Sequence, residues 1–213
     1  MSDNAPSVEW RPELTRFWPT LLARRALPGC EPHNAALVEL LLDMDGNREQ
    51  LTTRYQNADL LAVDDAAIAW LRRGLDATID RYFKRVGVAY PVHWNVQSWA
   101  NVNRAGDYHA PHNHAWCYLS GTYYVQVPRV ASSEDRSPGA ISFYDPRPAA
   151  SHSKLTGSTR EATAFTVLPE AGTVWLWHAS LNHLVHPNVA ETPRISISFN
   201  VILEWSNRYA SDE

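Results

Sequence analysis

The sequence predicts a mainly β fold, a sandwich or jelly roll with helices packed against its outside. Helical periodicity is confined to the first third of the chain, and short β-like runs separated by turn residues follow from about residue 90. The last of these runs, 194–203, alternates between polar and apolar residues. We expect a single domain over residues 1–213, with a helical part at about 1–88 packing on a β core at about 89–205.

Two helices and one strand are expected in the first part. Asn34 is the expected N-cap of a helix over 35–42. Apolar residues that recur every three or four positions predict a longer helix over about 65–85, which Gly87 ends. The segment 16–27 contains Pro19 and is expected as an edge strand, where the missing N–H of proline is tolerated.

At least six strands are expected after residue 90, and they cover 93–101, 119–127, 140–144, 165–168, 173–177 and 194–203. Along the last strand, four polar residues share one face and four apolar residues share the other: Arg194, Ser196, Ser198 and Asn200 against Ile195, Ile197, Phe199 and Val201. One side of the strand should therefore pack on a core, while the other lines water or a cavity.

Composition excludes several classes of protein. Hydrophobic residues make up 45% of the 213 residues and charged residues 20%, which is unlike a disordered chain. The net charge of −4 disfavours a nucleic-acid partner, and the glycines are too widely spaced for a nucleotide-binding loop. Because no apolar run is long enough to span a membrane and no signal region is found, we expect a cytoplasmic protein without a membrane partner. A homodimer stays open, since jelly-roll edges can pair.

Histidines form two clusters in the β-rich part of the chain. The clusters contain His109, His112 and His114 in one segment and His178, His183 and His186 in another. On a strand, residues i and i+2 point to the same side, so His112 and His114 can present two imidazoles to one metal ion. A third ligand from a distant strand would complete a facial set, and His183 is the candidate.

Six short segments resemble the iron(II)/2-oxoglutarate-dependent dioxygenase superfamily, and within it a group of small bacterial proteins. In order, they are His112-Asn-His114, Leu119-Ser-Gly-Thr-Tyr-Tyr-Val, Phe143-Tyr-Asp-Pro-Arg147, Gly172-Thr-Val-Trp-Leu, His183-Leu-Val-His-Pro187 and Arg194-Ile-Ser-Ile-Ser-Phe-Asn200. The resemblance implies a double-stranded β-helix, jelly-roll or cupin-like, that holds Fe(II) near one open end. It implies His112, His114 and His183 as ligands, and Arg194 as the partner of the far carboxylate of 2-oxoglutarate.

Further residues are assigned to the cosubstrate and the substrate. Ser196 shares a strand face with Arg194 and can add a hydroxyl donor to 2-oxoglutarate. Tyr123 and Tyr124 point to opposite faces, so one of them faces the cavity, and we assign Tyr123 to the cosubstrate. The expected substrate-binding residues, which share one face of their strand, are Asn95, Gln97 and Trp99.

One position departs from the family pattern. A carboxylate is usual where this chain has His114, so a three-histidine centre would replace two histidines and a carboxylate. His109 or Asp107 could replace one of the proposed ligands, and this choice is left open.

The resemblance implies a non-haem Fe(II)/2-oxoglutarate-dependent oxygenase. We expect it to hydroxylate a small molecule at an unactivated C–H bond with O2, releasing succinate and CO2, with no catalytic residue beyond the metal centre. Two alternatives are a three-histidine cupin-type dioxygenase that does not use 2-oxoglutarate and a non-catalytic jelly-roll binding module.

Overall fold

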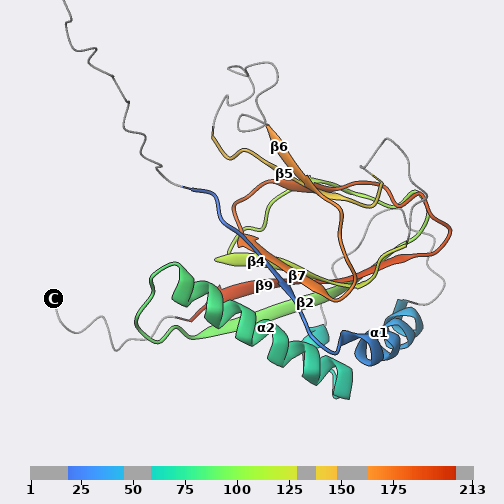
Figure 1. The fold of residues 1–213 in the computed structure, drawn as a ribbon, viewed down its shortest axis with the longest axis horizontal. Helices are drawn as coiled ribbons and strands as arrows, with labels where there is room; N and C mark the ends of the chain where they lie inside the picture. The colour runs from blue at the N-terminus through green and yellow to red at the C-terminus, as the bar shows by residue number, and fades with distance from the viewer. Residues whose placement is uncertain (1–18, 46–58, 129–137, 148–162, 205–213) are drawn as a thin grey trace, which may run out of the picture.

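The computed structural model describes residues 19–45, 59–128, 138–147 and 163–204. Within these ranges, two antiparallel sheets face each other, and the helices lie outside them (Figure 1). The helices are α1 (Cys30–Asp45), the single-turn η1 (Leu60–Ala62) and α2 (Ala66–Arg85). None of the helices in the described ranges is both long enough and apolar enough to cross a bilayer.

The larger sheet has five strands in the order β1 (Leu22–Ala26), β7 (Thr173–His178), β4 (Leu119–Gln126), β9 (Arg194–Leu203) and β2 (Trp94–Asn103). The smaller has four, in the order β3 (His109–His112), β8 (His183–Val185), β5 (Ile141–Tyr144) and β6 (Ala164–Val167). The two sheets form the jelly roll of a double-stranded β-helix, so the predicted fold class is confirmed.

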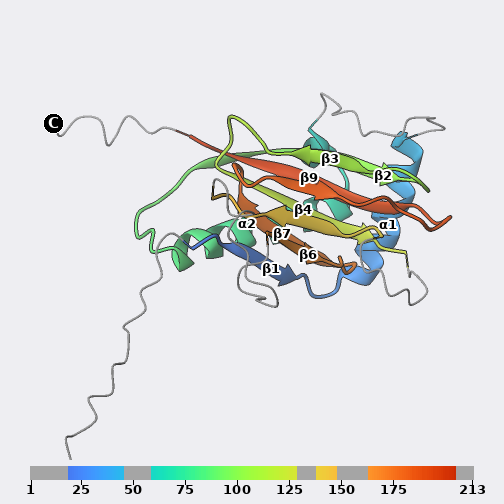
Figure 2. The same ribbon diagram turned by 90° about the horizontal axis from the view of Figure 1, so that it is seen from above.

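The two faces of the larger sheet have different partners. Helices α1 and α2 cover its outer face, and the smaller sheet lies on its inner side (Figures 1 and 2). Alternation along each strand sends apolar side chains outward to the helices, where they form the main core with Leu37, Leu71 and Ile79. The inner face therefore carries the polar side chains of β2, β4 and β9.

Several predicted boundaries differ from the observed ones. Helix α1 begins at Cys30, so Asn34 lies inside the helix and is not its N-cap. The first helical turn accepts Pro32, because the N–H that proline lacks has no partner there. Asp65 caps α2 by accepting hydrogen bonds from Ala67 and Ile68 N–H groups, as a helix over about 65–85 predicts.

Strand predictions were more accurate in the larger sheet than in the smaller one. The edge strand within 16–27 is observed as β1, although residues 16–18 lie outside the described ranges. Strand β9 has the predicted bounds. Strands β3 and β8 were not predicted, because they have only four and three residues and no alternating pattern.

Candidate metal centre

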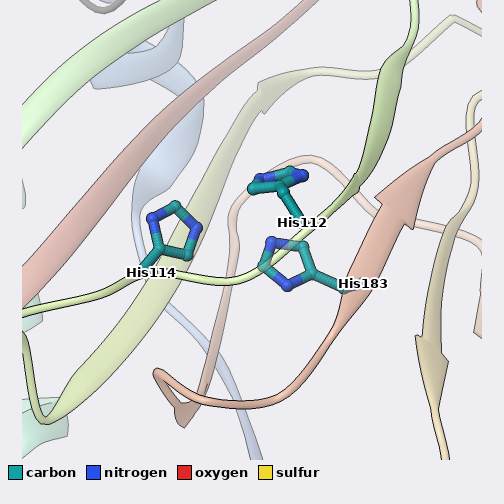
Figure 3. A group of neighbouring side chains, drawn as sticks. All are labelled: His112, His114 and His183. Atoms are coloured by element: carbon teal, nitrogen blue, oxygen red, sulfur yellow. The ribbon is translucent and has the colours of Figure 1, made fainter.

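Three histidines converge at the inner side of the smaller sheet. His112 ends β3 and lies directly across from His183, which begins β8. His114 follows in the β3–β4 loop, where its backbone N–H donates to the carbonyl of Ala179 at 3.0 Å. One ring nitrogen from each of the three histidines lies within 4.8 Å of those of the other two, and the rings point toward one another (Figure 3).

The loop, and not a strand, brings the second histidine to the cluster. We expected His112 and His114 to share one strand, but β3 ends at His112. The ring of His114 packs 5.2 Å from the rings of both other histidines and 5.8 Å from the Trp99 ring, between centroids. The hydrogen bond to Ala179 and the contact with Trp99 therefore hold this side chain in place.

Hydrogen bonds determine which nitrogen of two histidines is available. His112 Nδ1 donates to the Ala110 carbonyl at 2.7 Å, and His183 Nδ1 donates to the Leu181 carbonyl at 2.9 Å. A carbonyl can only accept, so the proton of each neutral ring is on Nδ1 and the lone pair is on Nε2. Both Nε2 atoms are thus suited to bind a metal ion.

Burial favours the neutral form of His114 and His183. Burial, together with a smaller contribution from the nearby His112, lowers the pKa of His183 to about 3 and that of His114 to about 4. Metal ions bind the neutral imidazole, so a low pKa in the metal-free protein favours the binding form at neutral pH.

A small cavity joins the histidines to the polar face of the larger sheet. Its walls include Trp99, Thr122, Trp177, Arg194 and Ser196. The polar residues form a connected network, which runs from Asn101 to Ser198 at 2.9 Å and from Ser198 to Thr122 at 3.1 Å. The cavity therefore has a metal-binding side on the smaller sheet and a hydrogen-bonding side on the larger one.

Arg194 is a buried cation on the hydrogen-bonding side. Its side chain is 2% exposed, and burial lowers the pKa of its guanidinium. The guanidinium carbon lies 5.1 Å from the centre of the Tyr124 ring, and Nη1 donates to Asn103 Oδ1 at 3.1 Å. No carboxylate among the described residues forms an ion pair with it. A buried, unpaired cation is costly to folding and indicates a place for an anion.

Unsatisfied polar atoms gather around the same space. In the part of the chain that the structure describes, the buried side-chain atoms without a hydrogen-bond partner include Arg194 Nε, the Tyr124 hydroxyl, Trp177 Nε1 and Asn101 Oδ1. Three of these four atoms are donors, and native proteins leave few buried donors unpaired. A bound acceptor would satisfy them.

The structure corrects the assignment of Tyr123. This side chain points to the outer face of the larger sheet, where its hydroxyl donates to Asn34 Oδ1 at 2.5 Å. It is fully buried in the core below the helices. Its neighbour Tyr124 points inward and lies across from Ser196, so the tyrosine nearest to Arg194 is Tyr124.

The three expected substrate-binding residues lie at different distances from the cavity. Trp99 lines it. Gln97 lies two positions along the same face, is exposed, and is the cross-strand partner of Asn200. Asn95 lies four positions from Trp99, about 13 Å along the strand, and its amide donates to Glu204. Asn95 is not among the residues that line the cavity, and its contact with substrate stays a prediction.

The alternative ligands lie outside the cluster. Asp107 closes a turn by accepting from the Arg104 N–H at 2.7 Å, and it does not line the cavity. His109 does line the cavity, but its Nε2 lies 3.1 Å from Asn103 Nδ2 and is engaged there.

Two residues of the site were not assigned from the sequence. The sequence indicates that either Tyr123 or Tyr124 faces the cavity but does not show which one. Asn103 lies beyond the end of the predicted strand 93–101. Asn103 has the same parity as Asn101 along β2, so extending the predicted strand by two residues would have placed it on the polar face.

The sequence matches one protein family, and the fold is similar to that of several solved structures. Residues 97–200 match the family described as "Putative 2OG-Fe(II) oxygenase". No curated protein matches the sequence.

The solved structures share the fold at low identity. A prolyl-4-hydroxylase of Pseudomonas putida superposes with a TM-score of 0.56 at 14% identity, covering 87% of this chain and 89% of that one. A Trichoplax adhaerens prolyl hydroxylase in complex with a hypoxia inducible factor peptide gives 0.56 at 15%, covering 90% and 87%. HygX of Streptomyces hygroscopicus, with nickel and 2-oxoglutarate bound, gives 0.54 at 14%, covering 85% and 81%.

Proposed function

Because the chain belongs to the iron(II)/2-oxoglutarate-dependent oxygenase superfamily, we propose that it hydroxylates a small molecule at an unactivated C–H bond. Members of this family are oxidoreductases that require Fe(II) and 2-oxoglutarate. When both are bound, O2 would be the oxidant: oxidation of 2-oxoglutarate to succinate and CO2 would supply two electrons and the substrate two, with one oxygen atom entering succinate and the other the substrate.

The residues of the cavity fit these groups. Three neutral imidazoles within 4.8 Å suit a divalent metal ion, and none of them carries charge to offset the metal. The buried, unpaired Arg194 suits a carboxylate, as do the free donors at its Nε and at the Tyr124 hydroxyl. The observation that carries the proposal is that the three histidines and Arg194 line one cavity.

In this proposal His112, His114 and His183 hold Fe(II). Arg194 binds the far carboxylate of 2-oxoglutarate through its Nε side, and Ser196 and Tyr124 donate hydroxyl groups beside it. Trp177, whose ring lies 5.0 Å from that of His183, and the buried Phe143 exclude water behind the metal. Trp99, which lies next to His114, would contact the substrate, and Gln97 lies beside Trp99 on the same strand face.

The first experiment tests the metal and cosubstrate site without turnover. Fe(II) and then 2-oxoglutarate are added anaerobically, and the visible metal-to-ligand charge-transfer band is recorded. We expect a band in the wild type, no band in His183→Ala, and a band needing far more 2-oxoglutarate in Arg194→Ala. Tight Fe(II) binding with no band at any 2-oxoglutarate concentration would contradict the assignment of the cosubstrate site.

A second experiment tests the substrate class. Succinate release and O2 uptake are compared with pools of small metabolites and with proline-containing peptides, since two of the similar structures are prolyl hydroxylases. We expect a small-molecule pool to stimulate both rates and to yield a product heavier by one oxygen atom. Stimulation by peptides alone would contradict the small-molecule proposal and leave the cosubstrate assignment intact.

A further inference from the structure

Asn103 connects two residues of the cavity wall. It is the last residue of β2 and lies directly across from Arg194 in the sheet. Its side chain is 1% exposed. Its Oδ1 accepts from Arg194 Nη1 at 3.1 Å, and its Nδ2 lies 3.1 Å from His109 Nε2. One amide group therefore bridges the buried arginine and a histidine.

The chemistry of the two neighbours allows one orientation of this amide. A guanidinium only donates, so the amide oxygen must face Arg194. The amide N–H then donates to Nε2 of a neutral His109, whose proton is on Nδ1. Rotation of the amide by half a turn would place N–H groups against the guanidinium and would lose both bonds.

The backbone of Asn103 is held as well. The carbonyl of Asn103 accepts a hydrogen bond from Asn188 Nδ2 at 3.0 Å. The side-chain amide of Asn188 also donates to the carbonyls of Ala190 and Thr192, at 3.3 and 3.0 Å. These carbonyls belong to the loop that leads into Arg194. The strand end, the loop and the side-chain amide thus form one fixed support.

This support determines which side of the guanidinium is free. The bond at Nη1 and the contact with the Tyr124 ring limit rotation of the planar group, while Nε has no partner. An arginine whose planar group is already fixed loses less conformational entropy when it binds an anion.

We propose that Asn103 is a positioning residue, which holds the Arg194 guanidinium with its Nε side toward the far carboxylate of 2-oxoglutarate, and that His109 fixes the orientation of Asn103. The proposal rests on the proposed function, because it assumes that Arg194 binds the cosubstrate.

Calorimetry on the Mn(II)-loaded protein without O2 tests it. The readout is the dissociation constant of 2-oxoglutarate, measured beside that of Mn(II) itself. Asn103→Ala should weaken 2-oxoglutarate about tenfold, the effect of one hydrogen bond to a charged group, and leave Mn(II) affinity unchanged. Asn103→Asp, which is of the same size, should weaken it more, because the new carboxylate pairs with Arg194 and competes with the ligand.

A double-mutant cycle separates positioning from general stability. If Asn103 acts through Arg194, Asn103→Ala should have no further effect on 2-oxoglutarate affinity in an Arg194→Ala background. Thr78→Val is the matched control, since it removes a buried hydrogen-bonding group from α2, on the other face of the sheet. It should lower the melting temperature and leave the 2-oxoglutarate constant unchanged.

Two results would overturn the inference: an unchanged constant in Asn103→Ala, or the same loss in both backgrounds. Failure of the wild type to bind 2-oxoglutarate at all would instead count against the proposed function, so the two failures are distinguishable.

Discussion

Where strand β9 begins, at Arg194–Ile197, both of its faces are buried, but they differ in chemistry. On the outer face, Ile195, Ile197, Phe199 and Val201 are fully buried against the helices. On the inner face, Arg194 is 2% exposed and Ser196 is 1% exposed. The outer face is satisfied by packing, whereas Arg194 Nε, on the inner face, lacks a partner. Burial alone therefore does not identify what a residue does, and an unsatisfied polar group in a buried place indicates a ligand.

The largest expected effect is on the outer face. Phe199→Ala should lower the free energy of unfolding by roughly 3–5 kcal/mol, because it empties a fully buried aromatic site. The cavity would not collapse easily, since the Phe199 ring occupies the space where Gly121 has no side chain. Urea unfolding measures the change. Wild-type stability in this variant would contradict the view that the outer face carries the core.

A substitution on the inner face should weaken binding of 2-oxoglutarate without lowering the free energy of unfolding. Arg194→Met should weaken 2-oxoglutarate about 100-fold, since a charge-assisted pair is lost. Its free energy of unfolding should be unchanged or higher, because an apolar side chain of similar size replaces a buried cation with few partners. Titration of the Mn(II)-loaded protein and urea unfolding give the two values. A large loss of stability with unchanged affinity would reverse the comparison.

A smaller effect is expected from the neighbouring hydroxyl. Ser196→Ala should weaken 2-oxoglutarate about fivefold, the usual effect of one neutral hydrogen bond. Its Oγ is 3.5 Å from Asn101 Nδ2, and that amide keeps its shorter bond to Ser198, so folding should change little. Ser198→Ala on the same strand face is the comparison, and it should affect stability more, because it breaks the network with Thr122.

The last prediction concerns how the stability of the metal-free protein depends on pH, and the change close to neutral pH should be the smallest of the effects described. The metal-free protein should be most stable above about pH 6.5, the pKa of an unfolded histidine, and should lose stability as the pH falls toward 3. The reason is that the pKa of His109 and His183 is lowered to about 3 and that of His114 to about 4, so the unfolded chain takes up protons first. Melting temperatures across this range measure the effect. A metal-free protein that is more stable at pH 5 than at pH 7 would contradict it.

Much of the architecture could be read from local patterns. Polar and apolar residues alternate along 194–203 because a strand exposes two faces, and this pattern located Arg194 and Ser196 on the polar one. The periodicity over 65–85 predicted α2. The spacing of His112 and His114, with a distant His183, predicted the residues that the structure brings together.

Other features depend on contacts between distant segments. Alternation shows that Tyr123 and Tyr124 face opposite ways, but only the packing of α1 against β4 makes the side of Tyr123 the core. Likewise, His114 reaches the cluster through a loop bonded to Ala179, and Asn103 meets Arg194 through the pairing of β2 with β9. The sequence by itself determined which residues share a face. Only the tertiary structure decided which face lines the cavity, because the partners of each face come from remote parts of the chain.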